Sequence, residues 1–247
     1  MTAVTRLAGA LLAVALAGCA PADRDADDAV TIPARAPVPA ATASTTAPAP
    51  TATSPAAATT RRHRFVWQVR AATRATLGSS WRPVCPVPPS RLRVVRLTFW
   101  TFDGDLAEGD LVLNRDVVDR ARRVFATMYR LRFPMRSVRP VTAYGSSDDR
   151  SMAADNTSAF NCRRAVAAGP PTWSNHAYGR AIDVNPVENP YLFQGRVLPP
   201  NGRAYTDRRR AAPGKIRRGD AVHRAFLAAG FAWGGDFSSP DYQHFDR

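Results

Sequence analysis

The sequence has few cysteines, almost no lysine and no long hydrophobic run. Three cysteines among 247 residues exclude a small scaffold held together by many disulfides. No apolar stretch reaches the roughly 18 residues of a membrane-spanning helix, which excludes a polytopic membrane protein. Lys215 is the only lysine, so arginine carries almost all of the positive charge behind the net charge of +14. The length allows one domain of ordinary size with additional segments.

Residues 1–18 have the pattern of a bacterial signal peptide. Arg6 precedes a short apolar stretch that ends at Ala17, and this stretch is too short for a stable transmembrane helix. The tetrapeptide Leu16-Ala17-Gly18-Cys19 resembles the lipobox of bacterial lipoproteins. In such proteins cleavage falls before the cysteine, whose sulfur receives a diacylglycerol. We therefore expect lipidation at Cys19; the alternative is plain secretion, with cleavage elsewhere.

Residues 19–61 are rich in alanine, threonine and proline and show no hydrophobic periodicity. A segment of this composition cannot bury enough apolar surface to offset the entropy lost on ordering, so we expect a disordered tether. The folded domain then covers residues 62–247. A lipid anchor followed by a tether predicts an extracytoplasmic protein at the outer face of the bacterial cell membrane, attached through its anchor only.

The positive charge lies on the predicted domain. Residues 1–61 contain four arginines and four aspartates, so the net charge of +14 belongs to residues 62–247. A basic domain attracts polyanions. Outside the membrane we expect these to be anionic wall polymers or lipid head groups rather than nucleic acid. The alternative is a solvated, arginine-rich surface without a specific partner.

Two cysteines, Cys85 and Cys162, remain once Cys19 is set aside. Two cysteines in an oxidising compartment favour one disulfide. The alternative is a pair of buried free thiols. Neither cysteine has a second cysteine or a histidine at zinc-finger spacing.

The hydrophobic pattern predicts one α+β domain with a mostly antiparallel sheet and flanking helices. β-Branched and aromatic residues predict strands over residues 91–101, 110–113 and 138–144. Apolar residues at helical spacing predict helices over residues 65–77, 116–131 and 220–229. Asp116 is the expected cap of the second helix, and Gly230 is expected to close the third. Residues 187–218, rich in proline, glycine and arginine, predict an irregular excursion over the surface.

Two short segments carry residues suited to metal chemistry, with His176 and Asp183 in the first and His244 in the second. Two imidazoles and one carboxylate, with a fourth position left to water, form the ligand set of a catalytic zinc site. His176 and Asp183 are seven residues apart, and on a straight strand this odd separation would put them on opposite faces. The chain must therefore turn between them, and Gly179 can supply the turn.

A zinc hydrolase also needs a base that accepts a proton from water. Asp241 lies three residues before His244, close enough to share one wall of the site without binding the metal. The alternative role of Asp241 is turn formation after Ser239-Pro240.

The pattern Ser174-x-His176-x-x-Gly179-x-Ala181-x-Asp183, followed by Asp241-x-x-His244, resembles the M15 zinc peptidases. These include D-Ala-D-Ala carboxypeptidases and dipeptidases and L-Ala-D-Glu endopeptidases of bacterial wall metabolism. The flanks at residues 151–163, 185–191 and 233–236 are similar as well, and the likeness covers residues 91–247. It implies a Hedgehog-type DD-peptidase fold, one Zn²⁺ held by His176, Asp183 and His244, and Asp241 as base. Many members have glutamate as the base, so Asp241 implies a slightly longer reach.

The same resemblance implies an arginine that holds the substrate, because a guanidinium binds carboxylates at two points and stays charged. The usual aromatic-arginine pair is absent, since Tyr144 is followed by glycine. Arg150 is the first candidate and Arg163 the second; either can instead pair with a nearby aspartate. Ser174 and Tyr178 are further candidates for binding substrate, although Ser174 can equally cap a turn.

Three functions follow from these patterns. The first is a monomeric, tethered zinc peptidase that hydrolyses an amide in peptidoglycan stem peptides, with a D,D-carboxypeptidase favoured over an L-Ala-D-Glu endopeptidase. The second is a wall-binding lipoprotein that retains zinc but turns over weakly or not at all. The third, a secreted basic nuclease, rests on charge alone and lacks a recognisable site for a hard cation and phosphate.

Overall fold

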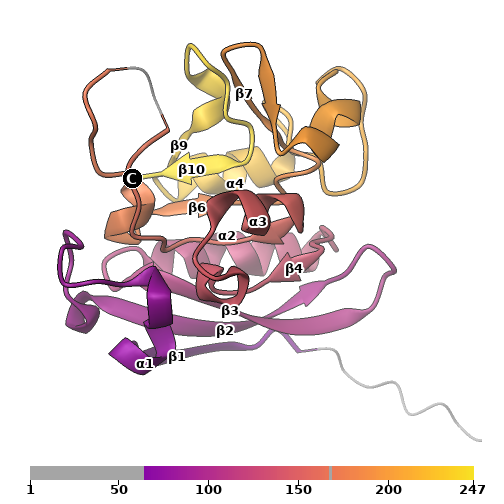
Figure 1. Cartoon of the computed structure of the whole chain (residues 1–247). Helices are drawn as coiled ribbons and strands as arrows, with labels where there is room; N and C mark the ends of the chain where they lie inside the picture. Colours follow the sequence, from indigo (N-terminus) through magenta and orange to yellow (C-terminus); the bar gives the residue numbers. More distant parts are fainter. Residues whose placement is uncertain (1–63, 167–168) are drawn as a thin grey trace, which may run out of the picture. The chain divides into compact units, whose positions relative to one another are not determined.

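The computed structural model describes residues 64–166 and 169–247. The predicted signal peptide, Cys19 and the tether lie outside the described residues. In the part described, no helix has the length and apolar character needed to cross a membrane. The chain there is a mixed α and β structure with antiparallel sheets and few helices, as predicted in outline (Figure 1).

The larger sheet has the strand order β1-β2-β3 and is antiparallel throughout. Strand β2 (Leu92–Trp100) pairs with β3 (Leu106–Asn114) along its whole length, and β1 (Trp67–Ala71) lies at the other side of β2. Successive side chains of a strand point to opposite faces. In β2 the odd-numbered Val95, Leu97 and Phe99 enter the main core, while Leu92 and Val94 enter a second, smaller core.

Helix α2 (Val118–Arg130) packs against the larger sheet and also contacts helix α4 (Ala221–Ala228) (Figure 1). Its apolar residues fall on one face at helical spacing, which is the pattern that predicted it. The residues buried on that face are Val118, Ala121, Val124, Phe125 and Met128. The main core therefore forms between this face of α2, the larger sheet, helix α4 and the second sheet described next.

A second antiparallel sheet has the order β6-β10-β9. Strand β6 (Ala181–Asp183) pairs with β10 (His244–Asp246), which pairs in turn with β9 (Ala232–Trp233). Ile182 and Phe245 place this small sheet in the same core as α2. The rings of Phe245 and Phe226 of α4 stack with centroids 3.8 Å apart, so the last strand of the chain is fixed by aromatic packing.

The rest of the described chain forms short elements. In chain order they are α1 (Arg74–Leu77), η1 (Gly78–Ser80), η2 (Pro89–Arg91), β4 (Ser137–Val138), η3 (Val141–Tyr144), α3 (Asp148–Ala153), β5 (Asn156–Thr157), η4 (Asn175–Tyr178), β7 (Tyr191–Phe193), β8 (Arg196–Leu198), η5 (Pro200–Tyr205) and η6 (Gly234–Asp236). Strands β4 and β5 pair in parallel, and β7 and β8 form an antiparallel hairpin.

The prediction of a helix over residues 65–77 was wrong for most of its length. Residues 67–71 form β1, which adds an edge strand to the larger sheet with Trp67 opposite Leu97, and only Arg74–Leu77 is helical. The helix starts at Thr73, whose hydroxyl accepts a hydrogen bond from the Thr76 amide. Pairing with a distant strand overrode the local helical spacing.

The strand predicted over residues 138–144 was also largely wrong. Only Ser137–Val138 is extended, and Val141–Tyr144 forms a 3-10 helix that follows Pro140. Proline has no amide hydrogen to donate to a sheet, which ends the strand. Residues 187–218, predicted to be irregular, contain the β7–β8 hairpin and η5.

The caps of the long helices were predicted with mixed success. Asp116 does not cap α2, because Val117 is its first flanking residue and makes no side-chain cap. The Asp116 carboxylate instead forms an ion pair with Arg180, which ties the start of α2 to the segment before β6. At α4, Asp220 accepts a hydrogen bond from the His223 amide, and Gly230 follows the helix with φ 81° as expected.

Cys85 and Cys162 form a disulfide with their Cα atoms 5.8 Å apart, which confirms the predicted pairing. The bond joins the segment before β2 to the segment after β5, one residue before Arg163. Arg82 binds the same point, since its Nη2 atom donates to the Cys162 carbonyl oxygen at 2.8 Å.

Replacing both cysteines by serine should lower the free energy of unfolding by about 4 kcal/mol, because the bond closes a loop of 77 residues in the unfolded chain. Denaturant unfolding of the oxidised chain and of the Cys85→Ser/Cys162→Ser variant measures this difference. A loss below about 1 kcal/mol would contradict the expected contribution of loop closure.

Candidate metal centre

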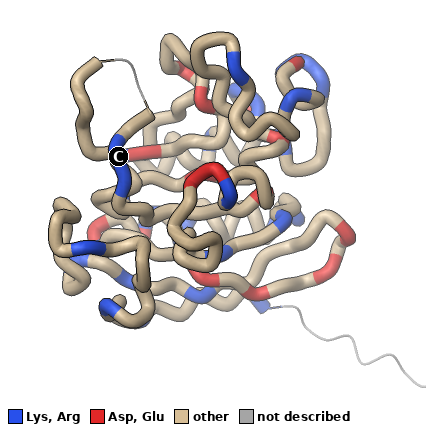
Figure 2. Tube along the Cα trace, viewed as in Figure 1, with Lys and Arg blue, Asp and Glu red and all other residues tan. Residues whose placement is uncertain are grey.

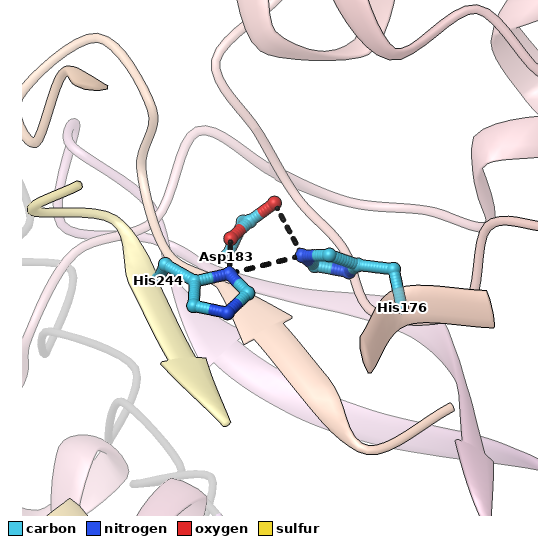
Figure 3. A group of neighbouring side chains, drawn as sticks. All are labelled: His176, Asp183 and His244. Atoms are coloured by element: carbon cyan, nitrogen blue, oxygen red, sulfur yellow. Dashed lines mark hydrogen bonds and ion pairs between the residues drawn. The ribbon is translucent and has the colours of Figure 1, made fainter. Parts of the chain in front are cut away.

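Three side chains singled out in the sequence, His176, Asp183 and His244, meet in the folded chain (Figure 3). One potential ligand atom from each lies within 4.8 Å of the other two, and all three residues are buried. His176 Nε2 lies 3.0 Å from Asp183 Oδ2 and 3.1 Å from His244 Nδ1. His244 Nδ1 lies 3.1 Å from Asp183 Oδ1. The predicted convergence of these residues is therefore present in the structure.

The path of the chain explains this convergence. His176 belongs to η4, which is capped by Ser174 at its start and by Gly179, with φ 67°, at its end. This left-handed turn reverses the chain, so that β6 brings Asp183 back toward the histidine. His244 is the direct cross-strand partner of Asp183 in the β6–β10 pair, and directly opposite residues in a sheet present their side chains on the same face.

A second layer of contacts fixes which nitrogen of each histidine faces the site. His176 Nδ1 lies 2.5 Å from the Ala159 carbonyl oxygen, so Nε2 faces the other two ligands. His244 is turned the other way, since its Nε2 lies 3.3 Å from Asp246 Oδ2 and its Nδ1 faces the site. Asn175 Nδ2 holds Asp246 in place with a hydrogen bond of 2.6 Å. Outer contacts of this kind orient the histidines of metal centres.

The buried Asp183 carboxylate is stabilised by positive charge next to it. Burial alone would raise the pKa of Asp183, but interaction with His176 and His244 outweighs it and holds the pKa well below its usual range. Burial would likewise lower the pKa of His244, yet hydrogen bonds with Asp183 and Asp246 raise it to about 10. The buried carboxylate is thus paired with cationic imidazole, and a metal cation can take over that charge.

The donor set suits one zinc ion. Three nitrogen and oxygen atoms about 3 Å apart on short, packed elements match an ion whose bonds to such atoms are about 2.0–2.2 Å long. Two imidazoles and one carboxylate leave a coordination position open, as in catalytic rather than structural centres. No other group of three metal-binding side chains lies within residues 64–166 and 169–247.

The cluster opens on a cavity of about 610 Å³, and Asp183 and His244 are among the residues that line it. Asp148, Arg163 and Ser174 form part of its wall, together with Asp241 and Gln243. Aromatic side chains at its edge supply apolar surface: Trp173, Tyr191 and Phe237. A pocket of this size with a few converging polar groups is typical of a site for a small or extended ligand.

Asp241 lies in the wall of this cavity, as its position before His244 led us to expect. Its Oδ1 atom is shielded from solvent and has no hydrogen-bond partner among the described residues. Burial raises the pKa of Asp241 to about 7, while the charges of His244 and Arg163 act against the rise. A carboxylate with a pKa near neutrality can both accept and return a proton. Gly234 permits this arrangement, since a Cβ there would lie 2.6 Å from the Asp241 carbonyl oxygen.

The arginine of the cavity is Arg163 and not Arg150. Arg163 lines the cavity, and its Nε forms an ion pair of 2.9 Å with Asp148 Oδ2. Burial would lower the pKa of Arg163, but the charges of Asp148 and Asp183 raise it, so the guanidinium stays cationic. Arg150 is exposed and does not line the cavity; its Nε donates to the Tyr144 carbonyl oxygen at 2.9 Å. The order of the two candidates is therefore reversed.

The other two predicted substrate contacts differ in position. Ser174 lines the cavity, and its hydroxyl accepts a hydrogen bond from the His176 amide. By capping η4 in this way, Ser174 helps to position His176, one of the three candidate metal ligands. Tyr178 packs against the smaller core and does not line the cavity. The ion pair of Arg163 with Asp148 is one of the arginine–aspartate pairings that the sequence left open, whereas the sequence reasoning missed Asp246. Asp246 lies two residues after His244 on the same strand, a spacing that could have drawn attention to it.

Replacing Gly179 by alanine should destabilise the chain by about 1–3 kcal/mol and weaken metal binding, because alanine disfavours positive φ. The new Cβ would also lie 2.8 Å from the Asn114 amide nitrogen. Gly104→Ala is the matched control, since Gly104 also has positive φ but open space around its Cβ. Thermal unfolding and zinc affinity measure both effects. Equal losses in the two variants would show that close approach at Gly179 contributes nothing.

Residues 168–247 match a family model of the M15 peptidases, which is described as D-alanyl-D-alanine carboxypeptidase. The matched segment contains His176, Asp183, Asp241 and His244. No curated protein and no solved structure matches the chain. The Hedgehog-type fold implied by the sequence resemblance therefore stays a prediction.

Proposed function

We propose that the chain is a zinc-dependent peptidase that hydrolyses an amide bond in peptidoglycan stem peptides, and the match of residues 168–247 to a family model of the M15 peptidases supports this. A D,D-carboxypeptidase is the favoured activity and an L-Ala-D-Glu endopeptidase the next. One observation carries the proposal: a buried His176–Asp183–His244 cluster opens on a cavity that also contains the shielded Asp241 carboxylate.

The cluster would hold the metal through His176 Nε2, His244 Nδ1 and a carboxylate oxygen of Asp183. Zinc, when bound by such a set, lowers the pKa of a water molecule and polarises a carbonyl. The chain's own contribution begins with the orientation of these ligands by the Ala159 carbonyl and by Asp246. Because both histidines are held from behind, the donor atoms need little rearrangement to bind the ion.

Asp241 acts as the general base. Its unpartnered Oδ1 accepts a proton from the attacking water and later delivers it to the leaving amine. Shielding from solvent keeps its pKa close to neutrality, which suits both halves of this transfer. Arg163 donates hydrogen bonds to the carbonyl oxygen, where negative charge develops, or to a carboxylate of the substrate. Asp148 holds that guanidinium in place through its ion pair.

The site of action is proposed from the sequence. A lipid on Cys19 and a tether up to residue 61 would hold the domain at the outer face of the bacterial membrane, within reach of the wall. The net charge of +14, carried by residues 62–247, supports binding to anionic wall polymers or lipid head groups. We infer that the protein acts there as a monomer and contacts the membrane through its anchor.

The test uses the full chain loaded with zinc and a defined stem pentapeptide, with products followed by mass spectrometry. Loss of one terminal alanine, absent with Asp241→Ala, would support a D,D-carboxypeptidase. A cut between L-Ala and D-Glu would support the endopeptidase. No product from the peptide or from intact wall, with zinc bound, would overturn the proposal and favour a wall-binding protein without turnover.

A further inference from the structure

A second cavity, of about 570 Å³, lies between the loop after η5 and the segment around β9. Four arginines line it, Arg208, Arg209, Arg217 and Arg218, while Asp220 is its only acidic residue. Figure 2 shows lysine and arginine gathered along the loop between η5 and α4. Tyr242 lines this cavity, and its sequence neighbours Asp241 and Gln243 line the candidate active site.

The acidic groups nearby do not balance this charge. Asp207 forms an ion pair of 3.0 Å with Arg209, and Asp236 pairs with Arg218. The Asp220 carboxylate binds backbone groups and no arginine side chain of the described residues: it accepts hydrogen bonds from the Arg217 and His223 amides at 2.7 and 2.8 Å. Two arginines, Arg208 and Arg217, are thus left without an ion pair in the described part of the chain, and the charge of Asp220 offsets only one of them.

Arg208 and Arg217 pair with no carboxylate among residues 64–166 and 169–247. Arg208 is half-buried, and its Nη atoms bind carbonyl oxygens of Glu188 and Ile216. Its Nε atom is shielded from solvent and has no hydrogen-bond partner in the part of the chain that the structure describes. Burial lowers the pKa of Arg208 to about 10, so the guanidinium is still charged at neutral pH. A partly desolvated cation without a counter-ion favours an anion beside it.

The chemistry favours phosphate. Guanidinium groups bind phosphate oxygens at two points and stay charged, and a cluster of them is the usual phosphate-binding arrangement. The cavity is larger than one phosphate group, so a chain of phosphodiesters fits it better than a single ion.

The aromatic rings of the cavity argue against nucleic acid. Arg208 lies over the ring of Tyr242 at 4.5 Å, and Arg218 lies over the ring of Trp233 at 5.3 Å. Both rings are covered by guanidinium groups, whereas proteins that bind single-stranded nucleic acid leave aromatic faces free for stacking with bases. Trp233 is also buried, so it cannot insert into a bilayer.

We propose that this cavity binds a polyol-phosphate chain through its phosphodiester groups, next to the peptidase site. Such a contact would hold the enzyme on the wall polymer while the neighbouring cavity processes peptide. The binding needs neither metal nor turnover, so it stands or falls independently of the proposed peptidase activity.

The experiment measures binding of the full chain to soluble poly(glycerol phosphate) by calorimetry at several salt concentrations. The variant is Arg217→Gln/Arg218→Gln, because both side chains are exposed. Arg208 is left unchanged, because its side chain donates hydrogen bonds to backbone carbonyl oxygens and its loss could disturb the fold. Arg115→Gln/Arg123→Gln removes the same charge from exposed positions outside this cavity. We expect the first variant to weaken binding at least about tenfold, with a shallower salt dependence, and the control to change it less than about twofold.

Equal weakening of polymer binding in both variants would overturn the proposal, since it would show that binding depends on the total charge of the chain and not on this cavity. No binding to the polymer would overturn it as well. Equal or tighter binding to single-stranded DNA or to polyglutamate of matched charge, or binding only to anionic phospholipid vesicles, would assign the cavity to another partner. Thermal unfolding of each variant confirms that the chains compared are folded.

Discussion

Asp241→Asn should lower kcat on a stem-peptide substrate by about 10²- to 10⁴-fold, because asparagine cannot accept a proton. The amide has nearly the shape of the carboxyl group, so the cavity and the backbone contact from Gly234 should persist. Asp241 is not one of the three converging ligands, and zinc content should stay at the wild-type level. A fall in kcat with unchanged zinc content is the signature of a lost base.

Asp119→Asn is the matched control, because Asp119 is exposed on α2 and does not line the cavity. It removes the same charge and should leave kcat and KM unchanged. If Asp241→Asn retained more than about a tenth of the wild-type kcat, the role of Asp241 as base would be refuted. If it lost zinc as well, the carboxylate would belong to the metal site.

Arg163→Gln should lower kcat/KM by about 10²- to 10³-fold, the usual effect of removing one donor from a developing oxyanion. The loss should be far smaller for Arg150→Gln, because Arg150 is directed to the Tyr144 carbonyl and does not line the cavity. Steady-state kinetics of both variants on one peptide gives the comparison directly.

Arg163→Lys distinguishes geometry from charge. Lysine keeps the positive charge but lacks the planar fork, so rescue should be partial. A role that is purely structural, through the ion pair with Asp148, would instead appear as a drop in thermal stability with unchanged kcat/KM. Equal kinetic losses for Arg150→Gln and Arg163→Gln would contradict the assignment of Arg163 to the substrate.

The parts of the fold that local sequence determines were predictable. Helix α2 carries its apolar residues on one face over several turns, and β2 is a long run of β-branched and aromatic residues, so each was identified near its true limits. Strand β1 was mistaken for a helix because what makes it a strand is its pairing with β2. Short strands such as β4 and β10 are likewise defined by their partners, which local patterns do not reveal.

The candidate site shows the same division. The histidines, Asp183 and Asp241 followed from residue type and spacing, including the turn at Gly179. The choice between Arg150 and Arg163 depended on how α3 starts. Ser147 caps that helix, Arg150 then reaches back to η3, and Arg163 is left facing the cavity. Asp246 was missed because its role depends on the register of β10.

The most direct test of the central claim is the zinc stoichiometry of the full chain, measured by metal analysis after dialysis against a weak chelator. The account predicts one zinc ion per chain, lost in each of His176→Ala, Asp183→Ala and His244→Ala and kept in Asp241→Asn. A folded wild-type chain without zinc, or with zinc that survives His244→Ala, would contradict it.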